Sequence, residues 1–291
     1  MEPLAVSVAR ELGLPAIADI HVHFMPERVM AAVWRHFDEA GPRLGREWPV
    51  RYRGSDEERV AILREHGVGL FAGLSYAHKP GMARYLTEWS VGFAERTPGA
   101  VATGTFFPEP GVLDYVTAAV EAGVQVFKVH VQVGEFDPAD AVLDDVWGLL
   151  EATGLPVVVH AGSGPVPGRY TGPALFGRVM ERHPELTAIV AHLGMPEERA
   201  FLEMVSRYPR LGLDLTMVGT DFMEQMHALD GSLLPRIREA GLDGRVFFGT
   251  DFPNIPYPYD HQVEVILRWD MGDDWLRHVL WLNTARLIGA G

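Results

Sequence analysis

Short apolar runs alternate with amphipathic stretches along the chain. Eight runs rich in Val, Ile, Leu and Phe predict β-strands. They are residues 16–24, 68–76, 100–107, 124–133, 155–162, 186–194, 211–217 and 246–252. The stretches between them, such as residues 55–67 and 111–123, carry apolar residues at helical spacing and several end in Gly or Pro. Apolar strands that alternate with helices predict a closed, parallel (β/α)8 barrel (TIM barrel).

The main rival is an open, doubly wound sheet. That fold usually binds a nucleotide at a glycine-rich turn after its first strand. Here the corresponding residues 21–29 read HVHFMPERV and contain no glycine. The length of 291 residues suits one barrel domain. We therefore predict a single barrel domain over residues 1–291.

Two segments are longer than the repeat of one strand and one helix requires. The connection over residues 25–55, after the first strand, is too long for a plain helix return. It is either a lid that contacts substrate or a helix followed by a packed surface loop. Residues 260–289 predict two or three further helices at the end of the chain. The expected fold is thus a barrel with an insertion after strand one and additional C-terminal helices.

Charge and composition remove several classes of function. Lys and Arg total 25 against 39 Asp and Glu, a formal net charge of −14 that repels nucleic acid and anionic membranes. No apolar run approaches the roughly 18 residues of a membrane span, and no basic leader precedes an apolar stretch. We expect a cytoplasmic protein. The chain has no cysteine, so any metal must be bound by His and carboxylate.

Polar residues that could bind a metal lie at the ends of several predicted strands. His21 and His23 share a face by alternation, and His160, His192 and Asp251 each end an apolar run. A lone His-x-His pair is more often incidental, and buried polar groups can also be satisfied by the backbone. Barrel enzymes, however, take their catalytic residues from the C-terminal ends of several strands. The set therefore predicts a site for a divalent metal, zinc first, with manganese, iron or nickel as alternatives.

The order of these residues resembles that of the amidohydrolase superfamily. Four phrases are most similar to the amidohydrolase-related branch, which includes aminocarboxymuconate-semialdehyde decarboxylase and several hydrolases. The phrases are DIHVHFMPE, VVVHAGSGP, AHLGMPE and FFGTDFP, within a resemblance over residues 17–289. It implies one divalent metal, usually zinc. The implied ligands are His21, His23, His160 and Asp251, with His192 beside them as a catalytic or secondary group.

The chemistry expected of such a site is hydrolysis. Metal lowers the pKa of its bound water, Asp251 can accept the proton, and His192 can polarise the group attacked. The expected substrate is a small carboxylated or cyclic amide, ester or lactone. One alternative is non-oxidative decarboxylation of an aromatic or enoic acid by a carboxy-lyase. A second alternative is a barrel that binds a small ligand without turnover.

The fourth predicted strand departs from the pattern of two-metal members, in which a carbamylated lysine bridges the ions. Here it reads FKVHVQV, in which Lys128 and His130 share a face. Lys128 is either a buried amine paired with a carboxylate in the barrel floor or a bridging group. His130 is predicted to neighbour the site and contact substrate. We expect one metal ion rather than two.

Three arginines are candidates for binding an anionic substrate. Arg51 and Arg53 lie in the long connection, and Arg169 lies in the glycine-rich loop after His160. Guanidinium groups match the geometry of a carboxylate, although each arginine alone is more often a surface residue. The apolar segment over residues 275–288 is a candidate homodimer contact, or else it caps the barrel.

Overall fold

The computed structural model describes residues 2–290. The chain divides into two compact units. Unit 1 combines Met1–Ala72 with Leu215–Gly291, and unit 2 consists of Gly73–Asp214. Segments from both ends of the sequence thus belong to the same unit.

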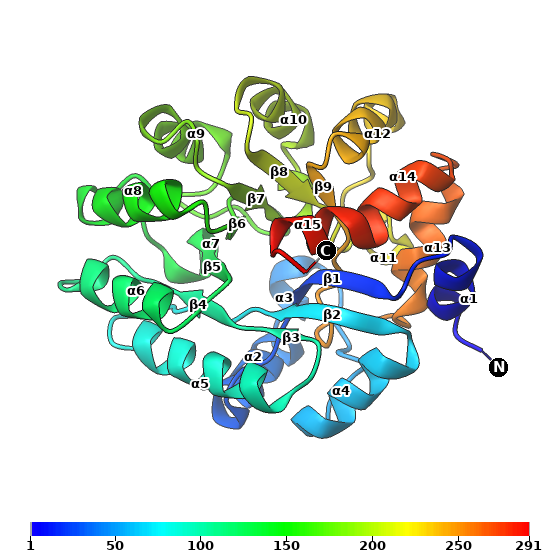
Figure 1. Cartoon of the computed structure of the whole chain (residues 1–291), viewed down its shortest axis with the longest axis horizontal. Coiled ribbons are helices and arrows are strands. Elements are labelled where there is room, and N and C mark those ends of the chain that lie inside the picture. Colours follow the sequence, from blue (N-terminus) through cyan, green and yellow to red (C-terminus); the bar gives the residue numbers. More distant parts are fainter. Residues whose placement is uncertain (1, 291) are drawn as a thin grey trace. The chain divides into compact units, whose positions relative to one another are not determined.

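Unit 2 contains a sheet of parallel strands that pair in chain order (Figure 1). The strands are β4 (Thr103–Thr105), β5 (Val126–His130), β6 (Val157–His160), β7 (Ala188–Val190) and β8 (Leu211–Asp214). Their residues are almost entirely buried, as expected for parallel strands that are covered by helices. The register places His130 of β5 directly opposite His160 of β6.

Helices follow most strands of unit 2. They are α5 (Ala83–Arg96), α6 (Val112–Glu121), α7 (Val131–Gly134), α8 (Asp144–Thr153), α9 (Pro173–Arg182) and α10 (Glu198–Arg207), with short 3-10 helices η1 (Ala141–Leu143) and η2 (Ala191–Gly194). Of these, α5, α6, α8, α9 and α10 lie along the outside of the sheet of unit 2 (Figure 1). The larger helices bury one apolar side, such as Val146, Trp147 and Leu150 of α8. Helix α8 ends at Gly154, whose φ of 70° is the left-handed conformation that glycine adopts at helix ends.

Three details of unit 2 differ from the sequence prediction. The sixth predicted strand, expected to reach residue 194, ends at Val190 and continues as η2, which contains His192. The third predicted strand is interrupted at Ala102 and forms two short strands, β3 (Ala100–Val101) and β4. The fourth predicted strand, expected to reach residue 133, ends at His130 and continues directly as α7. The side chain of His130 accepts the N–H of Val133 and caps this helical turn, which explains why the strand stops there.

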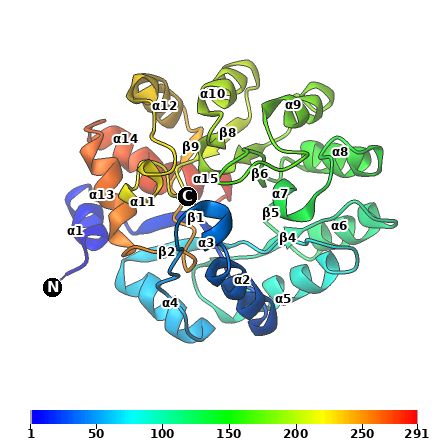
Figure 2. The same ribbon diagram turned by 180° about the vertical axis from the view of Figure 1, so that it is seen from behind.

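Unit 1 contains strands β1 (Ile17–Val22), β2 (Val68–Gly73, of which Gly73 already belongs to unit 2) and β9 (Val246–Phe247). Strands β1 and β2 are neighbours in one sheet and lie side by side in Figure 2. The segment that follows β9 runs along β1, where the N–H of Ile20 donates to the carbonyl of Phe248 over 3.0 Å. Segments from opposite ends of the sequence are therefore joined by backbone hydrogen bonds.

The helices of unit 1 include the insertion after β1 and the predicted C-terminal helices. They are α1 (Leu4–Glu11), α2 (Glu27–Asp38), α3 (Gly41–Leu44), α4 (Asp56–Glu65), α11 (Asp221–Glu224), the 3-10 helix η3 (Gly231–Leu233), α12 (Leu234–Leu242), α13 (Asp260–Arg268), α14 (Asp273–Arg277), the π-helix η4 (His278–Leu282) and α15 (Asn283–Leu287). Helix α4 begins with a capping box between Ser55 and Glu58. Helix α1 lies beside α13, where Asp260 accepts the N–H groups of Leu4 and Ala5 (Figure 2).

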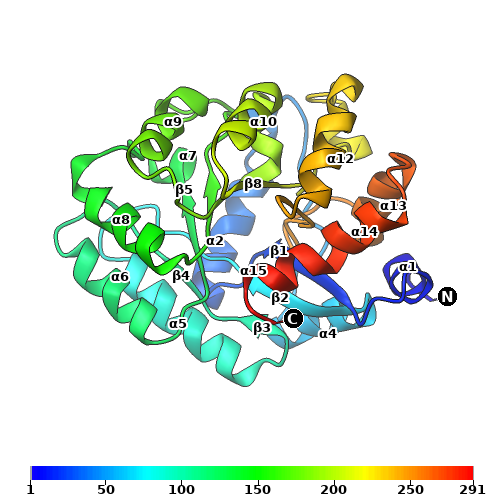
Figure 3. The ribbon, with the colours of Figure 1, turned by 45° about the horizontal axis from the view of Figure 1, so that its top comes forward.

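The C-terminal helices pack against β1 inside unit 1 (Figure 3). Trp275, Val279 and Leu280 are fully buried, whereas Leu282 is partly exposed. Most of the apolar side chains in this segment are thus buried in the core of unit 1, as expected of a segment that caps the barrel. The homodimer contact stays a prediction. Within residues 2–290, no helix is long and apolar enough to cross a membrane.

Candidate metal centre

Two buried histidines lie at the end of strand β1. Every residue of β1 is buried, His21 lies within the strand, and His23 follows directly after its last residue, Val22. Their side chains are 1% and 5% exposed. Gly249 lies behind His21, where an added Cβ would be only 2.8 Å from the Cβ of His21. A glycine is therefore required at this position for the strand to approach so closely.

Asp251 reaches the same place from the segment after β9. Its N–H donates to the carbonyl of His21 over 2.8 Å, which fixes its backbone against β1. Its φ of 70° is unusual for a residue other than glycine, and such strained positions often occur at functional sites. Tyr257 lies further along the same loop. Burial raises the pKa of its phenol well above the usual value, and the charge of Asp251 adds to this, so Tyr257 stays neutral.

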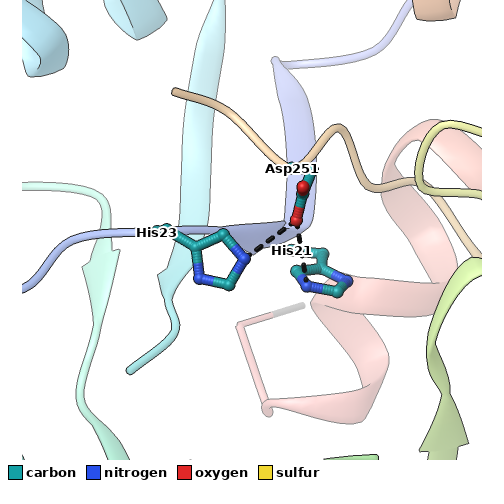
Figure 4. A group of neighbouring side chains, drawn as sticks. All are labelled: His21, His23 and Asp251. Atoms are coloured by element: carbon teal, nitrogen blue, oxygen red, sulfur yellow. Dashed lines mark hydrogen bonds and ion pairs between the residues drawn. The ribbon is translucent and has the colours of Figure 1, made fainter. Parts of the chain in front are cut away.

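The three side chains converge (Figure 4). Oδ1 of Asp251 lies 2.8 Å from Nε2 of His23 and 3.5 Å from Nε2 of His21. The two rings are nearly perpendicular, with centroids 5.1 Å apart. One potential ligand atom from each residue lies within 4.8 Å of the other two. Two imidazoles and one carboxylate in a buried group form a donor set that suits a divalent metal.

Unit 2 holds a second group of imidazoles, of which His130 and His160 end β5 and β6 and His192 lies in η2, directly after β7. His130 and His160, paired in register, stack with ring centroids 3.9 Å apart and an interplanar angle of 11°. His192 meets His160 edge-on at 4.8 Å. Tyr76 lies on the other side of His130, with centroids 5.0 Å apart. The structure thus brings together the three histidines that the sequence placed at the ends of neighbouring strands.

The orientations of His160 and His192 follow from local hydrogen bonds. Nε2 of His160 lies 3.0 Å from the carbonyl oxygen of Gly164, so this nitrogen carries the proton and donates. The lone pair of the neutral ring is then on Nδ1, the atom that can bind a metal. His192 has a φ of 56°, and its backbone N–H donates to the buried carboxylate of Asp214 over 2.8 Å. Asp214 therefore holds His192 in a conformation that β-strands do not adopt.

The long connection after β1 is anchored to the loop that carries Asp251. Nε1 of Trp48 donates to the carbonyl of Asn254 over 2.7 Å, and the N–H of Arg51 donates to the carbonyl of Ile255 over 3.0 Å. Phe37 packs against Trp48, with ring centroids 5.3 Å apart. This segment is therefore part of the structure that surrounds Asp251, and it combines the predicted helix with a packed loop.

The remaining predicted substrate contacts are found in varied surroundings. Arg51 and Arg169 are exposed, and Arg169 lies over the ring of Tyr170. Arg53 is also exposed and forms an ion pair with Asp38, so an anionic substrate would have to displace that carboxylate. Lys128 is fully buried on β5, as expected for a residue deeper in the strand than His130. The roles of these residues stay predictions.

Sequence analysis missed the buried carboxylates that support the histidines. Asp19 lies two residues before His21 and accepts hydrogen bonds from the backbone of His21 and from the hydroxyls of Thr250 and Tyr259. Asp214 supports His192 in unit 2. The alternation that paired His21 with the next histidine also places Asp19 on the same face, so that signal was present in the sequence.

Comparison with solved structures identifies the fold. An uncharacterized TIM-barrel protein from Bordetella bronchiseptica has a TM-score of 0.73 and 18% identity, with 94% of this chain and 98% of that chain covered. A probable 2-pyrone-4,6-dicarboxylic acid hydrolase from Acinetobacter baumannii, with citric acid bound, has a TM-score of 0.60 and 13% identity, with 95% and 100% covered. These likenesses confirm the predicted (β/α)8-barrel fold.

A third solved structure combines the fold with a metal. It is 5-carboxyvanillate decarboxylase from Novosphingobium aromaticivorans, complexed with manganese and 4-hydroxy-3-methoxy-5-nitrobenzoic acid. Its TM-score is 0.62 and its identity 15%, with 96% of this chain and 97% of that chain covered. None of the curated proteins compared with the chain matches it. The family model described as amidohydrolase matches residues 18–290, and the chain therefore belongs to the amidohydrolase family of enzymes.

Proposed function

We propose that the chain is a metal-dependent hydrolase that acts on a small anionic amide, ester or lactone. The observation that carries this proposal is the buried group of His21, His23 and Asp251. Imidazole and carboxylate are the ligand types that catalytic zinc sites use in the absence of cysteine. Zinc is the ion that we propose, and the same donor set also accepts manganese, iron or nickel.

The proposed ligand set also includes His160, through Nδ1. Two arguments support this assignment. The first is the hydrogen bond from Nε2 to the carbonyl of Gly164, which orients the ring and leaves the lone pair on the other nitrogen. The second is the fold, because residues at the C-terminal ends of strands gather at one face of a (β/α)8 barrel. His192 completes the proposed site as the residue that contacts the substrate.

A divalent metal bound at this site would supply a Lewis acid and an activated water. The side chains supply the proton transfers. Asp251 accepts a proton from the attacking water and passes it to the leaving group. His192, held through its backbone by Asp214, donates a hydrogen bond to the oxygen on which charge develops. Neither step requires a cysteine, which the chain lacks.

The substrate contacts that we propose come from Arg51, Arg53, Arg169 and His130. An anionic substrate suits the three guanidinium groups and agrees with the citric acid and the nitrobenzoic acid named in two of the compared structures. A single (β/α)8 domain over residues 1–291 and a cytoplasmic location remain part of the proposal.

Decarboxylation of an aromatic acid is the alternative. The aromatic residues that pack around the loop after β9, which carries Asp251, favour it because they could contact an aromatic ring. Trp48 contacts both Phe37 and Phe222 there. Purified enzyme loaded with zinc or manganese and incubated with a panel of lactones, amides and aromatic acids tests both readings. A hydrolase produces one new carboxylate per turnover, whereas a decarboxylase releases carbon dioxide. Turnover that persists after the metal is removed contradicts both, and no turnover supports a barrel that only binds a ligand.

A further inference from the structure

Strand β1 buries a carboxylate directly below the proposed metal ligands. Asp19 is 0% exposed, and by alternation it lies on the same face of β1 as His21. An ionised group so far from water is costly unless hydrogen-bond donors surround it. The contacts of Asp19 therefore indicate why it is there.

Hydrogen-bond donors from different segments of unit 1 bind Asp19. The N–H of His21 donates to Oδ1 over 3.1 Å. The hydroxyl of Thr250 donates to Oδ2 over 2.6 Å, and the phenol of Tyr259 donates to the same oxygen over 3.0 Å. Burial raises the pKa of Tyr259 well above the usual value, and the charge of Asp19 raises it further, so the phenol keeps the proton that it donates.

We propose that Asp19 is a positioning residue that sets the distance between His21 and Asp251. One of its oxygens binds the backbone of His21, and the other binds Thr250, the residue before Asp251. The same buried carboxylate thereby holds both proposed metal ligands, His21 through its own backbone and Asp251 through the residue before it. Metal–ligand distances tolerate errors of only about 0.2 Å, so a fixed reference between the two ligands has a direct effect on affinity. The inference rests on the proposed metal site.

The test uses Co²⁺ as the probe, because its affinity and visible absorption report on the ligand geometry without any substrate. Asp19→Asn keeps the shape of the side chain but turns one oxygen into an N–H donor, which cannot accept from the groups around it. We expect this variant to bind Co²⁺ about 10- to 100-fold more weakly in competition with a chelator, as changes behind metal ligands commonly do. We also expect its absorption spectrum to change.

Thr250→Val and Thr250→Ser give a matched pair in case Asp19→Asn does not fold. Valine removes the hydroxyl that binds Asp19, whereas serine retains it. We expect weaker Co²⁺ binding and an altered spectrum in the valine variant, and near-normal binding in the serine variant. Val263→Ala, in the buried face of α13, is the control for general loss of stability, with a lower melting temperature and unchanged Co²⁺ affinity.

The outcomes separate this inference from the function on which it rests. Failure of the unsubstituted protein to bind one Co²⁺ per chain removes the metal site and the inference with it. If the unsubstituted protein binds Co²⁺, and folded Asp19→Asn and Thr250→Val bind it with the same affinity and spectrum, the positioning role alone is wrong. An equal loss of Co²⁺ affinity in Val263→Ala also overturns the positioning role, because the affinity would then depend only on the stability of the fold.

Discussion

Alanine at position 249 places a methyl group against the back of a proposed metal ligand. Its Cβ would lie 2.8 Å from Cβ of His21 and 2.2 Å from Oγ1 of Thr216, whereas ordinary contacts begin near 3.4 Å. His21 must therefore retreat by 3.4 minus 2.8 Å, which is about 0.6 Å, unless the backbone of β1 moves instead. This displacement is about three times the tolerance of a metal–ligand distance, about 0.2 Å.

Two consequences follow for Gly249→Ala. We expect the affinity for zinc to fall at least about tenfold, a difference of about 1.4 kcal/mol. We expect the free energy of unfolding of the metal-free protein to fall by about 1–3 kcal/mol, as is typical of an overpacked core. Chelator competition measures the first quantity, and urea denaturation in the presence of EDTA measures the second.

Gly231→Ala is the matched control for this experiment. A Cβ at Gly231 meets nothing within 4 Å, and its backbone does not have the left-handed conformation that disfavours alanine. This variant should keep the zinc affinity and the stability of the unsubstituted protein. Equal zinc affinities in Gly249→Ala and Gly231→Ala would refute the reasoning, because His21 would then not be a ligand whose position matters.

Five further substitutions test the site. His21→Ala and Asp251→Asn should each abolish activity and lower the metal content while the circular dichroism spectrum stays unchanged, because the barrel core does not depend on the ion; full activity in either variant would disprove the assigned ligands. His160→Ala should weaken metal binding, whereas His192→Ala should retain the metal and lower kcat by about 10²-fold or more, as the loss of a polarising donor does; metal loss from both or from neither would contradict this division. Trp48→Phe leaves a buried carbonyl without its donor, so the unfolding free energy should fall by about 1–3 kcal/mol and KM should rise; an unchanged KM would remove this segment from the site.

The strand pattern of the chain was readable from its sequence because parallel strands are buried on both faces. Runs such as VVVH and AIVAH therefore stand out from the amphipathic helices. The break at Ala102 was not predictable, since one apolar residue between two short strands leaves the pattern unchanged. The early end of β5 depends on the side chain of His130, which accepts a backbone N–H three residues later.

The group of His21, His23 and Asp251 was predictable because its signals are also local in the sequence. Alternation places His21 and His23 on one face, and an apolar run that ends in an acid marks Asp251. The residues that surround this group depend on contacts between distant segments. The hydrogen bond from Tyr259 to Asp19 joins residues 240 positions apart, and no local sequence pattern predicts it. The left-handed conformation of His192 likewise depends on Asp214, from the next strand of the sheet.

A crystal structure of the zinc-loaded protein, with anomalous scattering measured at the zinc edge, tests the central claim most directly. We predict one strong anomalous peak within about 2.2 Å of Nε2 of His21, Nε2 of His23 and a carboxylate oxygen of Asp251, the distances usual for zinc. The peak should also lie at bonding distance from Nδ1 of His160. A peak at any other group of side chains, or no peak from protein that contains zinc, would contradict the account.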